Sequence, residues 1–261
     1  MRVENKPLPG STGGQSIFAK FVDHAETYGP HVIKDFLHDI SLQNNTVTQI
    51  LDIGAGQGRD LSLAQQIFPK AALFAAENSL PYIEVLKPKV DTIFSVNIEK
   101  DNFPLKNTSI DIIIANQVLE HTKEIFWIMH EISRCLRVGG YFIMGVPNVA
   151  SLHNRLLLML GIHPTQHKLY SAHVRPFSKR DTLKFMQYCF PKGYTLEKFA
   201  GGQFYPFPPK LARLCCQLIP SMAFSIFFLF KKVKPYISEF IDYPGKCSLE
   251  TPFYTGNRLE I

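Results

Sequence analysis

The sequence predicts an α/β fold with a doubly wound, mostly parallel sheet, and three observations support this prediction. Short apolar runs alternate with helical patterns from residue 46 onward. The runs are continuously apolar, which is typical of parallel strands that are covered on both faces. With 261 residues, 46% of them hydrophobic and 19% charged, the chain has the size and composition of one large globular domain with an added element.

Seven strands are expected, five in succession and two that complete the edge of the sheet. Their ranges are 47–53, 71–76, 91–97, 110–115, 141–146, 194–199 and 222–232. A helix over 122–137 separates the fourth and fifth strands, because its apolar residues have helical spacing, and Gly139-Gly140 is predicted to end it. Ser178 and Asp181 have the spacing of a capping box and predict that another helix begins there.

These patterns divide the chain into three parts. An N-terminal arm with helices is expected over 1–45, the sheet domain over 46–233 and a polar C-terminal tail over 234–261. Within the sheet domain, the alternation of strands and helices stops over residues 149–180. We predict that this segment is a helical and loop insertion after strand five, which covers the substrate as a lid.

The positive charge of the chain is concentrated in this segment. The net charge is +6, and residues 149–180 contribute +5 because they contain five Lys and Arg and no Asp or Glu. A local basic patch argues against a nucleic-acid partner. The five cysteines form no CxxC pair, and the first residues include no apolar leader segment, so we expect no metal site, reduced thiols and a cytoplasmic protein.

One apolar stretch raises the question of a membrane. Residues 214–230 are mostly apolar and precede a Lys-Lys-Val-Lys run, but Pro220 would break a spanning helix near its middle. A short helix followed by a buried strand is the preferred interpretation. The segments 152–161 and 211–230 leave open a peripheral contact with the inner face of a membrane.

The stretch ILDIGAGQGRD carries the strongest functional signal. Its glycines at 54, 56 and 58 differ in spacing from the G-x-G-x-x-G loop of dinucleotide enzymes, and the G-K-[ST] of triphosphate-binding loops is absent. Asp52, at the end of the first strand, would repel a pyrophosphate but suits a cationic ligand. Glu77 ends the second strand, where a carboxylate can accept hydrogen bonds from ribose hydroxyls. The loop therefore indicates a nucleoside without a pyrophosphate.

With these pieces in place, the sequence resembles the class I S-adenosylmethionine-dependent methyltransferases of the type 11 branch. The matching motifs are LDIGAGQG, FAAEN, FPLKNTSIDIIIANQVLEHT and RCLRVGGYFIMGVPN, which follow one another over about 48–148. The resemblance implies a Rossmann-like fold, S-adenosylmethionine as the cofactor and a small-molecule, oxygen-bearing methyl acceptor. Two residues depart from the family pattern: Asn97 stands where Asp is frequent, and Val138 replaces the proline of the PGG turn.

The resemblance also implies roles in cofactor binding. Asp52, Gly54, Gly56 and Gly58 would hold the methionine part of the cofactor, and Glu77 would bind the ribose. Asn97 and Ile98 would flank the adenine, and Asn116 and Gln117 would lie near the sulfonium.

Candidate residues for the acceptor side are histidines and arginines. His121 follows the fourth strand, and His153 and His173 lie in the expected lid, so each is a candidate general base. Arg155 and Arg175, also in the lid, would bind an anionic acceptor such as an acidic sugar, an acyl acid or a lipid head group. For each of them the alternative is a structural or solvated side chain.

Three other functions remain open. A nicotinamide-dependent oxidoreductase would fit the Tyr-x-x-x-Lys pair at Tyr194 and Lys198, but the glycine spacing is wrong and in a strand these residues lie about 13 Å apart. A nucleic-acid amino-methyltransferase would have Asn-Pro-Pro-aromatic after strand four, where this chain reads ANQV. A non-catalytic binding or partner protein with this fold is disfavoured by the intact glycine loop and Glu77.

Overall fold

A single seven-stranded sheet in the order β3-β2-β1-β4-β5-β7-β6 organises the computed structural model, which describes residues 27–43 and 46–256. The first five strands are parallel, and β7 lies antiparallel between β5 and β6. The strands are β1 (Gln49–Ile53), β2 (Ala72–Ala76), β3 (Thr92–Phe94), β4 (Ile110–Asn116), β5 (Leu136–Pro147), β6 (Tyr194–Gly202) and β7 (Ser225–Lys232). The predicted seven-stranded, mostly parallel α/β sheet is confirmed.

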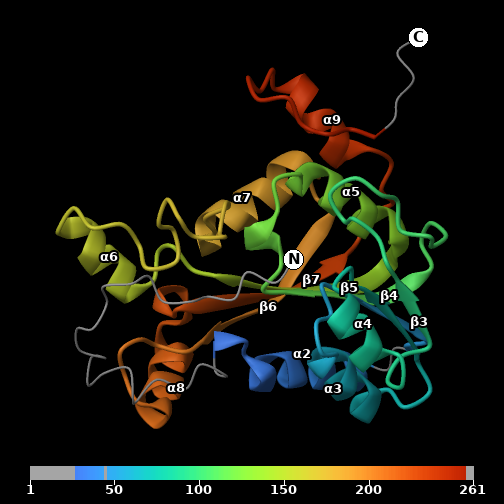
Figure 1. Cartoon of the computed structure of the whole chain (residues 1–261), viewed down its shortest axis with the longest axis horizontal. Coiled ribbons are helices and arrows are strands. Elements are labelled where there is room, and N and C mark those ends of the chain that lie inside the picture. Colours follow the sequence, from blue (N-terminus) through green and yellow to red (C-terminus); the bar gives the residue numbers. More distant parts are fainter. Residues whose placement is uncertain (1–26, 44–45, 257–261) are drawn as a thin grey trace.

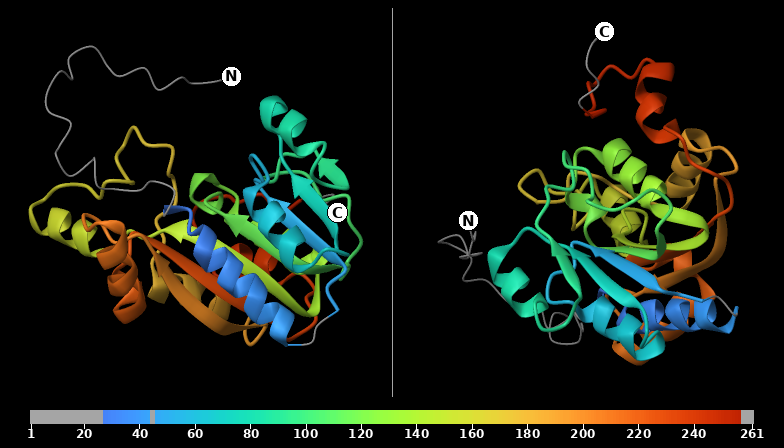
Figure 2. Two further views of the ribbon diagram at one scale, coloured as in Figure 1. Left: turned by 90° about the horizontal axis from the view of Figure 1, so that it is seen from below. Right: turned by 90° about the vertical axis from the view of Figure 1, so that its right-hand side faces the viewer.

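Helices cover both faces of this sheet (Figure 1). On one face lie α2 (Pro30–Leu42), α3 (Arg59–Ile67) and α4 (Leu80–Leu86), and on the other α5 (Ile125–Cys135), α7 (Lys179–Cys189) and α9 (Glu239–Lys246). Two more helices, α6 (Leu152–Met159) and α8 (Pro209–Leu218), gather at the same end of the molecule in both Figure 1 and the left view of Figure 2. Short 3-10 turns, η2 (Leu119–His121) and η3 (Pro220–Met222), follow β4 and α8.

The central strand β4 explains why the apolar runs of the sequence are continuous. Its first six residues are buried, and successive side chains point to opposite faces. Ile113 and Ala115 enter the core beneath α5, whereas Ile112 and Ile114 enter the core beneath α2 and α3. Burying an isoleucine side chain stabilises the fold by about 1.5–3 kcal/mol. Because β4 buries isoleucines on both of its faces, packing on both sides of the sheet stabilises this strand.

The boundary between α5 and β5 differs from the prediction. The helix ends at Cys135 and the strand begins at once, so that Leu136 pairs with Ile110 and Tyr141 with Ile112. Gly139-Gly140 therefore lies in a bulge within β5 and does not cap the helix. The last turn of the helix is instead satisfied by the buried Lys232 ammonium, which donates to two carbonyls at 2.6 and 2.7 Å.

The apolar stretch 214–230 is divided among three elements. It supplies the end of α8, the η3 turn that begins at Pro220, and most of β7, which starts at Ser225, three residues later than expected. Within the part of the chain that the structure describes, no helix is long and apolar enough to cross a membrane.

Residues 234–256 are more than the polar tail that was expected. They contain α9, whose Phe240 is fully buried in the core beneath α5 and α7. The sequence pattern did not predict α9 because the segment is mostly polar and the helix has only three buried residues, Phe240, Ile241 and Pro244. Of the arm and helices expected over 1–45, residues 1–26 lie outside the described residues, and α2 is the helix that the structure describes.

Candidate active site

A cavity of about 920 Å³ lies beyond the carboxyl ends of β1, β2 and β4, and we call it the strand-end cavity. In open α/β sheets this edge is the usual place for ligands, because loops from several parallel strands meet there. The cavity is lined by Gly54, Ala76, Glu77, Asn78, Ser79, Leu80, Pro81, Tyr82, Val96, Asn97, Ile98, Glu99, Val118, His121 and Thr122. Its volume is that of a site for a nucleoside-sized ligand.

The glycine loop forms the junction between β1 and α3. All three glycines have positive φ, with 67° at Gly54, 55° at Gly56 and 76° at Gly58, a conformation that other residues adopt only with strain. A Cβ on Gly54 would lie 2.7 Å from Val118 Cγ2, so this glycine also allows the loop to approach β4. Apart from the two neighbouring residues in the chain, the nearest atom to a Cβ on Gly56 would be the Gly54 carbonyl oxygen at 4.0 Å, which indicates that this glycine faces open space.

Glu77 connects the glycine loop to the loop after β2. Its carboxylate accepts hydrogen bonds from the backbone N–H of Gly56 at 2.8 Å, of Asn78 at 2.9 Å and of Ser79 at 2.8 Å. An ionised carboxylate has about four acceptor positions, so these three bonds leave about one for a ligand. Glu77 lines the strand-end cavity, and that position is available to one ribose hydroxyl.

Asp52 lies under the cavity and does not line it. The side chain is buried, and burial together with the charges of Asp60 and Glu77 raises the pKa of this carboxyl well above its usual value, against the opposing effect of Arg59. Repulsion among neighbouring carboxylates means that a cationic ligand nearby would lower the energy of the charged state. Asp60 was not identified from the sequence, although it directly follows the glycine loop.

The third side of the cavity follows β3. Asn97 and Ile98 both line it, and Ile98 forms an apolar wall with Val96 and with Leu80 of α4. The Asn97 amide oxygen already accepts a hydrogen bond from the Glu99 N–H at 3.0 Å. Apolar walls beside a polar rim suit a flat aromatic base.

Asn116 and Gln117, at the end of β4, do not line the cavity. The Asn116 amide donates to Asp60 Oδ2 at 2.7 Å and to the Tyr28 carbonyl at 3.0 Å, which gives it a structural role in this conformation. Gln117 has φ 57°, which is strained for a residue with a side chain, and its buried Nε2 donates to none of the described residues. Backbone strain of this kind clusters at functional sites, which keeps Gln117 a candidate.

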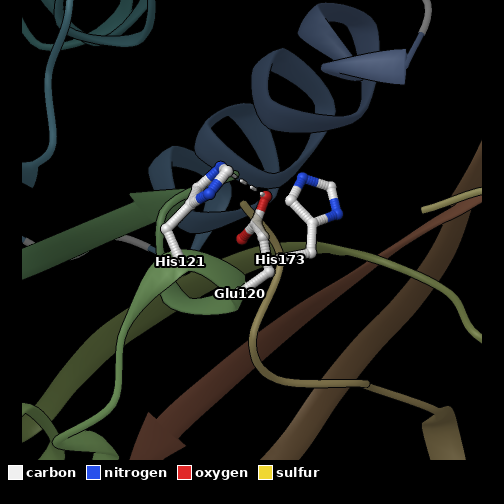
Figure 3. Close-up of side chains that lie close together, drawn as sticks. All are labelled: Glu120, His121 and His173. Atoms are coloured by element: carbon white, nitrogen blue, oxygen red, sulfur yellow. Dashed lines mark ion pairs between the residues drawn. The ribbon is translucent and has the colours of Figure 1, made fainter. Parts of the chain in front are cut away.

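His121 and His173 come together although they are far apart in the sequence. Their rings meet edge to face with centroids 4.7 Å apart, and His121 lines the strand-end cavity. The buried Glu120 carboxylate lies between the two rings in Figure 3, with Oε1 3.8 Å from His121 Nε2. Burial raises the pKa of Glu120 to about 8, and burial, with the neighbouring His121 and His167, lowers the pKa of His173 to about 4.

Glu120 was missed by the sequence reasoning. The available signal was a carboxylate next to Leu119 in a stretch that continues a buried strand. An acid that is 1% exposed there must be either protonated or held by a partner.

His153 lies elsewhere, in the first turn of α6, with its side chain buried. Its ring stacks on Phe224 at 5.2 Å and contacts Tyr205 at 5.1 Å, and Nδ1 is 3.1 Å from Ser151 Oγ. Burial lowers the pKa of this histidine to about 4. It does not line the strand-end cavity.

The two arginines of the 149–180 segment are also separate from the cavity. Arg155 is exposed and donates from Nε to the Ala150 carbonyl at 2.8 Å. Arg175 donates to the carbonyls of Thr122 and Lys123 and lines a second cavity of about 660 Å³. It therefore holds the segment against the loop that precedes α5.

Comparisons with known proteins agree with this geometry. A family model described as a methyltransferase domain matches residues 25–188, which is more than half of the chain. The malonyl-[acyl-carrier protein] O-methyltransferase of Methylococcus capsulatus is 32% identical over 95 residues, which cover 35% of this chain and 34% of that protein. A probable S-adenosylmethionine-dependent methyltransferase of Mycolicibacterium smegmatis is 29% identical over 100 residues, 38% of each chain. The chain thus spans about a third of the length of these curated relatives.

Solved structures support the fold. The crystal structure of a SAM-dependent methyltransferase from Archaeoglobus fulgidus is similar with a TM-score of 0.52 and 16% identity, over 80% of this chain and 100% of that one. The plantazolicin methyltransferase BpumL, in complex with S-adenosylhomocysteine (SAH), is similar with a TM-score of 0.55 and 16% identity, over 80% of this chain and 85% of that one. With the family match and the seven-stranded sheet, these findings show that the chain belongs to the class I S-adenosylmethionine-dependent methyltransferase family.

Proposed function

We propose that this protein transfers the methyl group of S-adenosylmethionine to an oxygen atom of a small-molecule acceptor. One observation carries the proposal: a single cavity is lined both by the acid and apolar groups that suit a nucleoside, Glu77 and Ile98, and by His121, which contacts His173. The open space over Gly56 and the unpaired Gln117 amide fit a ligand at this edge of the sheet. Bound there, S-adenosylmethionine would supply a methyl group on a cationic sulfur.

The residues of the chain would contribute mainly through position. Glu77 would hold the nucleoside, and apolar residues such as Val96 and Val118 would exclude water from the reacting groups. Holding two reactants in line is worth about 7–11 kcal/mol of the barrier. A hydroxyl acceptor must also lose its proton, and the cluster of Glu120, His121 and His173, which reaches the cavity through His121, can serve this step.

We further propose that the acceptor is anionic, as a carboxylate, an acidic sugar or a lipid head group would be. The 149–180 segment supports this proposal, because it carries five positive side chains and no acid. The relative from Methylococcus capsulatus is by its name an O-methyltransferase of an acyl group. Arg155 and Arg180 are the exposed arginines of the segment, whereas Arg175 is held by backbone carbonyls.

A turnover assay with a panel of acceptors tests this function. The panel contains small carboxylates, acidic sugars, phospholipid head groups and neutral phenols, and mass spectrometry detects an added methyl group together with SAH formation. Methylation of an anionic member, weakened in Arg155→Ala, is the expected result. Calorimetric binding of SAH with no methylated acceptor would favour the non-catalytic alternative, and binding of NADH in place of SAH would favour an oxidoreductase.

A peripheral membrane contact is a separate proposal that rests on exposed apolar side chains. Met159 of α6 is 82% exposed and Leu218 of α8 is 72% exposed. The two helices lie at the same end of the molecule (Figure 2). We expect co-sedimentation with anionic vesicles that weakens in Met159→Glu, and an absence of sedimentation at low salt would contradict this proposal.

A further inference from the structure

We propose that Glu120, His121 and His173 form a binding site for a divalent first-row transition metal ion, of which Zn²⁺ is the reference case. One possible ligand atom from each side chain lies within 4.8 Å of the others. The three residues come from the η2 turn after β4 and from the segment before α7, and Figure 3 shows their side chains directed toward one another.

The Glu120 carboxylate is the first argument for a cation. Its side chain is 1% exposed, and its Oε2 accepts no hydrogen bond from any residue that the structure describes. Oε1 lies 3.8 Å from His121 Nε2, which is too long for a hydrogen bond, and the carboxylate also interacts with the backbone N–H of Glu120 itself. A buried carboxylate oxygen without a partner is costly, and a metal ion is one of the few partners that satisfies it.

The two histidines supply the second argument. His121 Nδ1 lies 3.2 Å from the Ala172 carbonyl, and because a carbonyl can only accept, this nitrogen carries the proton. The lone pair is then on Nε2, the nitrogen that faces Glu120. Metal-binding histidines commonly donate their other nitrogen to a carbonyl in this way. His173 adds a second ring whose buried Nδ1 has no partner among the described residues.

The backbone holds the cluster in place. The Glu120 carbonyl accepts the N–H groups of Val174 at 2.8 Å and Arg175 at 3.1 Å, which fixes the position of His173 beside η2. The guanidinium of Arg175 binds the carbonyls of Thr122 and Lys123 and strengthens the same junction. The site is therefore built from two chain segments that the fold keeps together.

The donor set defines the class of metal. Two imidazoles with one carboxylate suit zinc and its neighbours in the first row, whereas Mg²⁺ and Ca²⁺ prefer oxygen donors alone. Bonds of about 2.0–2.2 Å require donors about 3.0–3.5 Å apart, so the most distant donors, which lie within 4.8 Å of each other, would have to close by up to about 1.8 Å. Three protein ligands leave at least one coordination position for an exogenous oxygen.

This open position gives the metal a chemical role, which rests on the proposed function. Because His121 also lines the strand-end cavity, an acceptor oxygen bound to the metal would lie beside the cofactor. The metal would lower the pKa of an acceptor hydroxyl, whose proton leaves to solvent. The oxygen lone pair then forms the O–CH₃ bond while the S–CH₃ bond breaks, and its electron pair stays on sulfur to give neutral SAH.

Metal binding by the full chain tests the inference without any turnover. Protein treated with EDTA and dialysed is titrated with Zn²⁺ by calorimetry and with Co²⁺ by visible absorption, which reports its coordination. We expect one ion per chain, and affinity at least about 100-fold weaker in Glu120→Gln and in His173→Asn. His163→Asn, an exposed histidine of the same segment, is the matched control and should bind like the parent protein.

Circular dichroism and thermal melting, with and without Zn²⁺, show whether each variant is folded, and the parent protein should melt at a higher temperature with the ion. Absence of stoichiometric binding to the parent protein would overturn the inference, as would equal affinity in Glu120→Gln and the control. SAH calorimetry is run separately. If the chain binds SAH but no metal ion, the metal site is wrong and the proposed function stands. If it binds the metal ion but not SAH, the metal site stands and the proposed function is wrong.

Discussion

Replacing Glu77 by glutamine tests how the conformation of the glycine loop and ligand binding in the strand-end cavity depend on each other. In the native chain the Glu77 carboxylate accepts hydrogen bonds from three backbone N–H groups, those of Gly56, Asn78 and Ser79. About one acceptor position remains for a ligand. Glutamine has the same shape, but one carboxylate oxygen becomes an amide that donates. That amide cannot accept from Gly56 or from a ribose hydroxyl.

The size of the effect follows from these hydrogen bonds. Loss of one bond to a charged acceptor costs about 1.5–3 kcal/mol, so SAH should bind about 10- to 150-fold more weakly to Glu77→Gln. The Gly56 N–H loses its acceptor as well, and an unsatisfied group of this kind lowers the free energy of unfolding by about 1–3 kcal/mol. Both changes have the same cause and should appear together.

Calorimetry with SAH and urea unfolding measure the two quantities. Glu84→Gln in α4 is the matched control, because Glu84 is exposed and only pairs with Lys87 at 2.6 Å. An exposed pair of this kind is worth about 0.5 kcal/mol or less, and SAH affinity should not change. If Glu77→Gln bound SAH within about twofold of the parent protein, the assignment of this carboxylate to the nucleoside would be wrong.

Three further variants test the fold and the site. Lys232→Met leaves two carbonyls at the end of α5 without the ammonium and should lower the free energy of unfolding in urea by about 2–4 kcal/mol. The control Lys231→Met should lower it by less than about 1 kcal/mol, and equal losses would contradict the capping role of Lys232. Burial lowers the pKa of His153 from 6.5 to about 4, so the unfolded chain takes up the proton first and stability falls as the pH drops from 6.5 toward 4. His153→Phe should therefore flatten that fall in melting temperature, and an unchanged pH dependence would refute this cause. Gly54→Ala should reduce the melting temperature and SAH affinity, and should lower the free energy of unfolding by about 1–3 kcal/mol. The reason is that its Cβ would lie 2.7 Å from Val118 Cγ2 at a φ of 67°. An unaltered melting temperature would show that the loop relaxes freely.

Local patterns sufficed where the physical cause is local. The Ser178 cap is confirmed, since its Oγ accepts the Asp181 N–H at 3.3 Å, and Pro220 interrupts the apolar stretch as expected. Tyr194 and Lys198 lie on β6 and take separate partners, Ser133 and Asp39. Gly139-Gly140 was misjudged because glycines end helices and form bulges equally well, and the pairing of Leu136 with Ile110 decided the outcome.

The meeting of Gly54, Glu77, Asn97 and Ile98 at one cavity was predictable from the sequence for the same reason. Glycine spacing and an acid at the end of a strand are short-range signals, and a parallel sheet brings strand ends together by its topology. The acceptor side was visible only as single residues. The sequence offered His121, His153 and His173 as separate candidates, whereas the structure brings the first and third together and leaves His153 in an aromatic cluster.

The sequence by itself determined the succession of the seven strands, the glycine loop and the family, because periodicity, turn chemistry and motif spacing are properties of neighbouring residues. Only the tertiary structure decided which of the distant polar groups meet. Glu120 and His173 are separated by more than fifty positions, and they meet because the Glu120 carbonyl binds two N–H groups just after His173. Non-local hydrogen bonds of this kind leave no pattern along a single chain, so the charge cluster beside the cofactor cavity becomes apparent only in the folded protein.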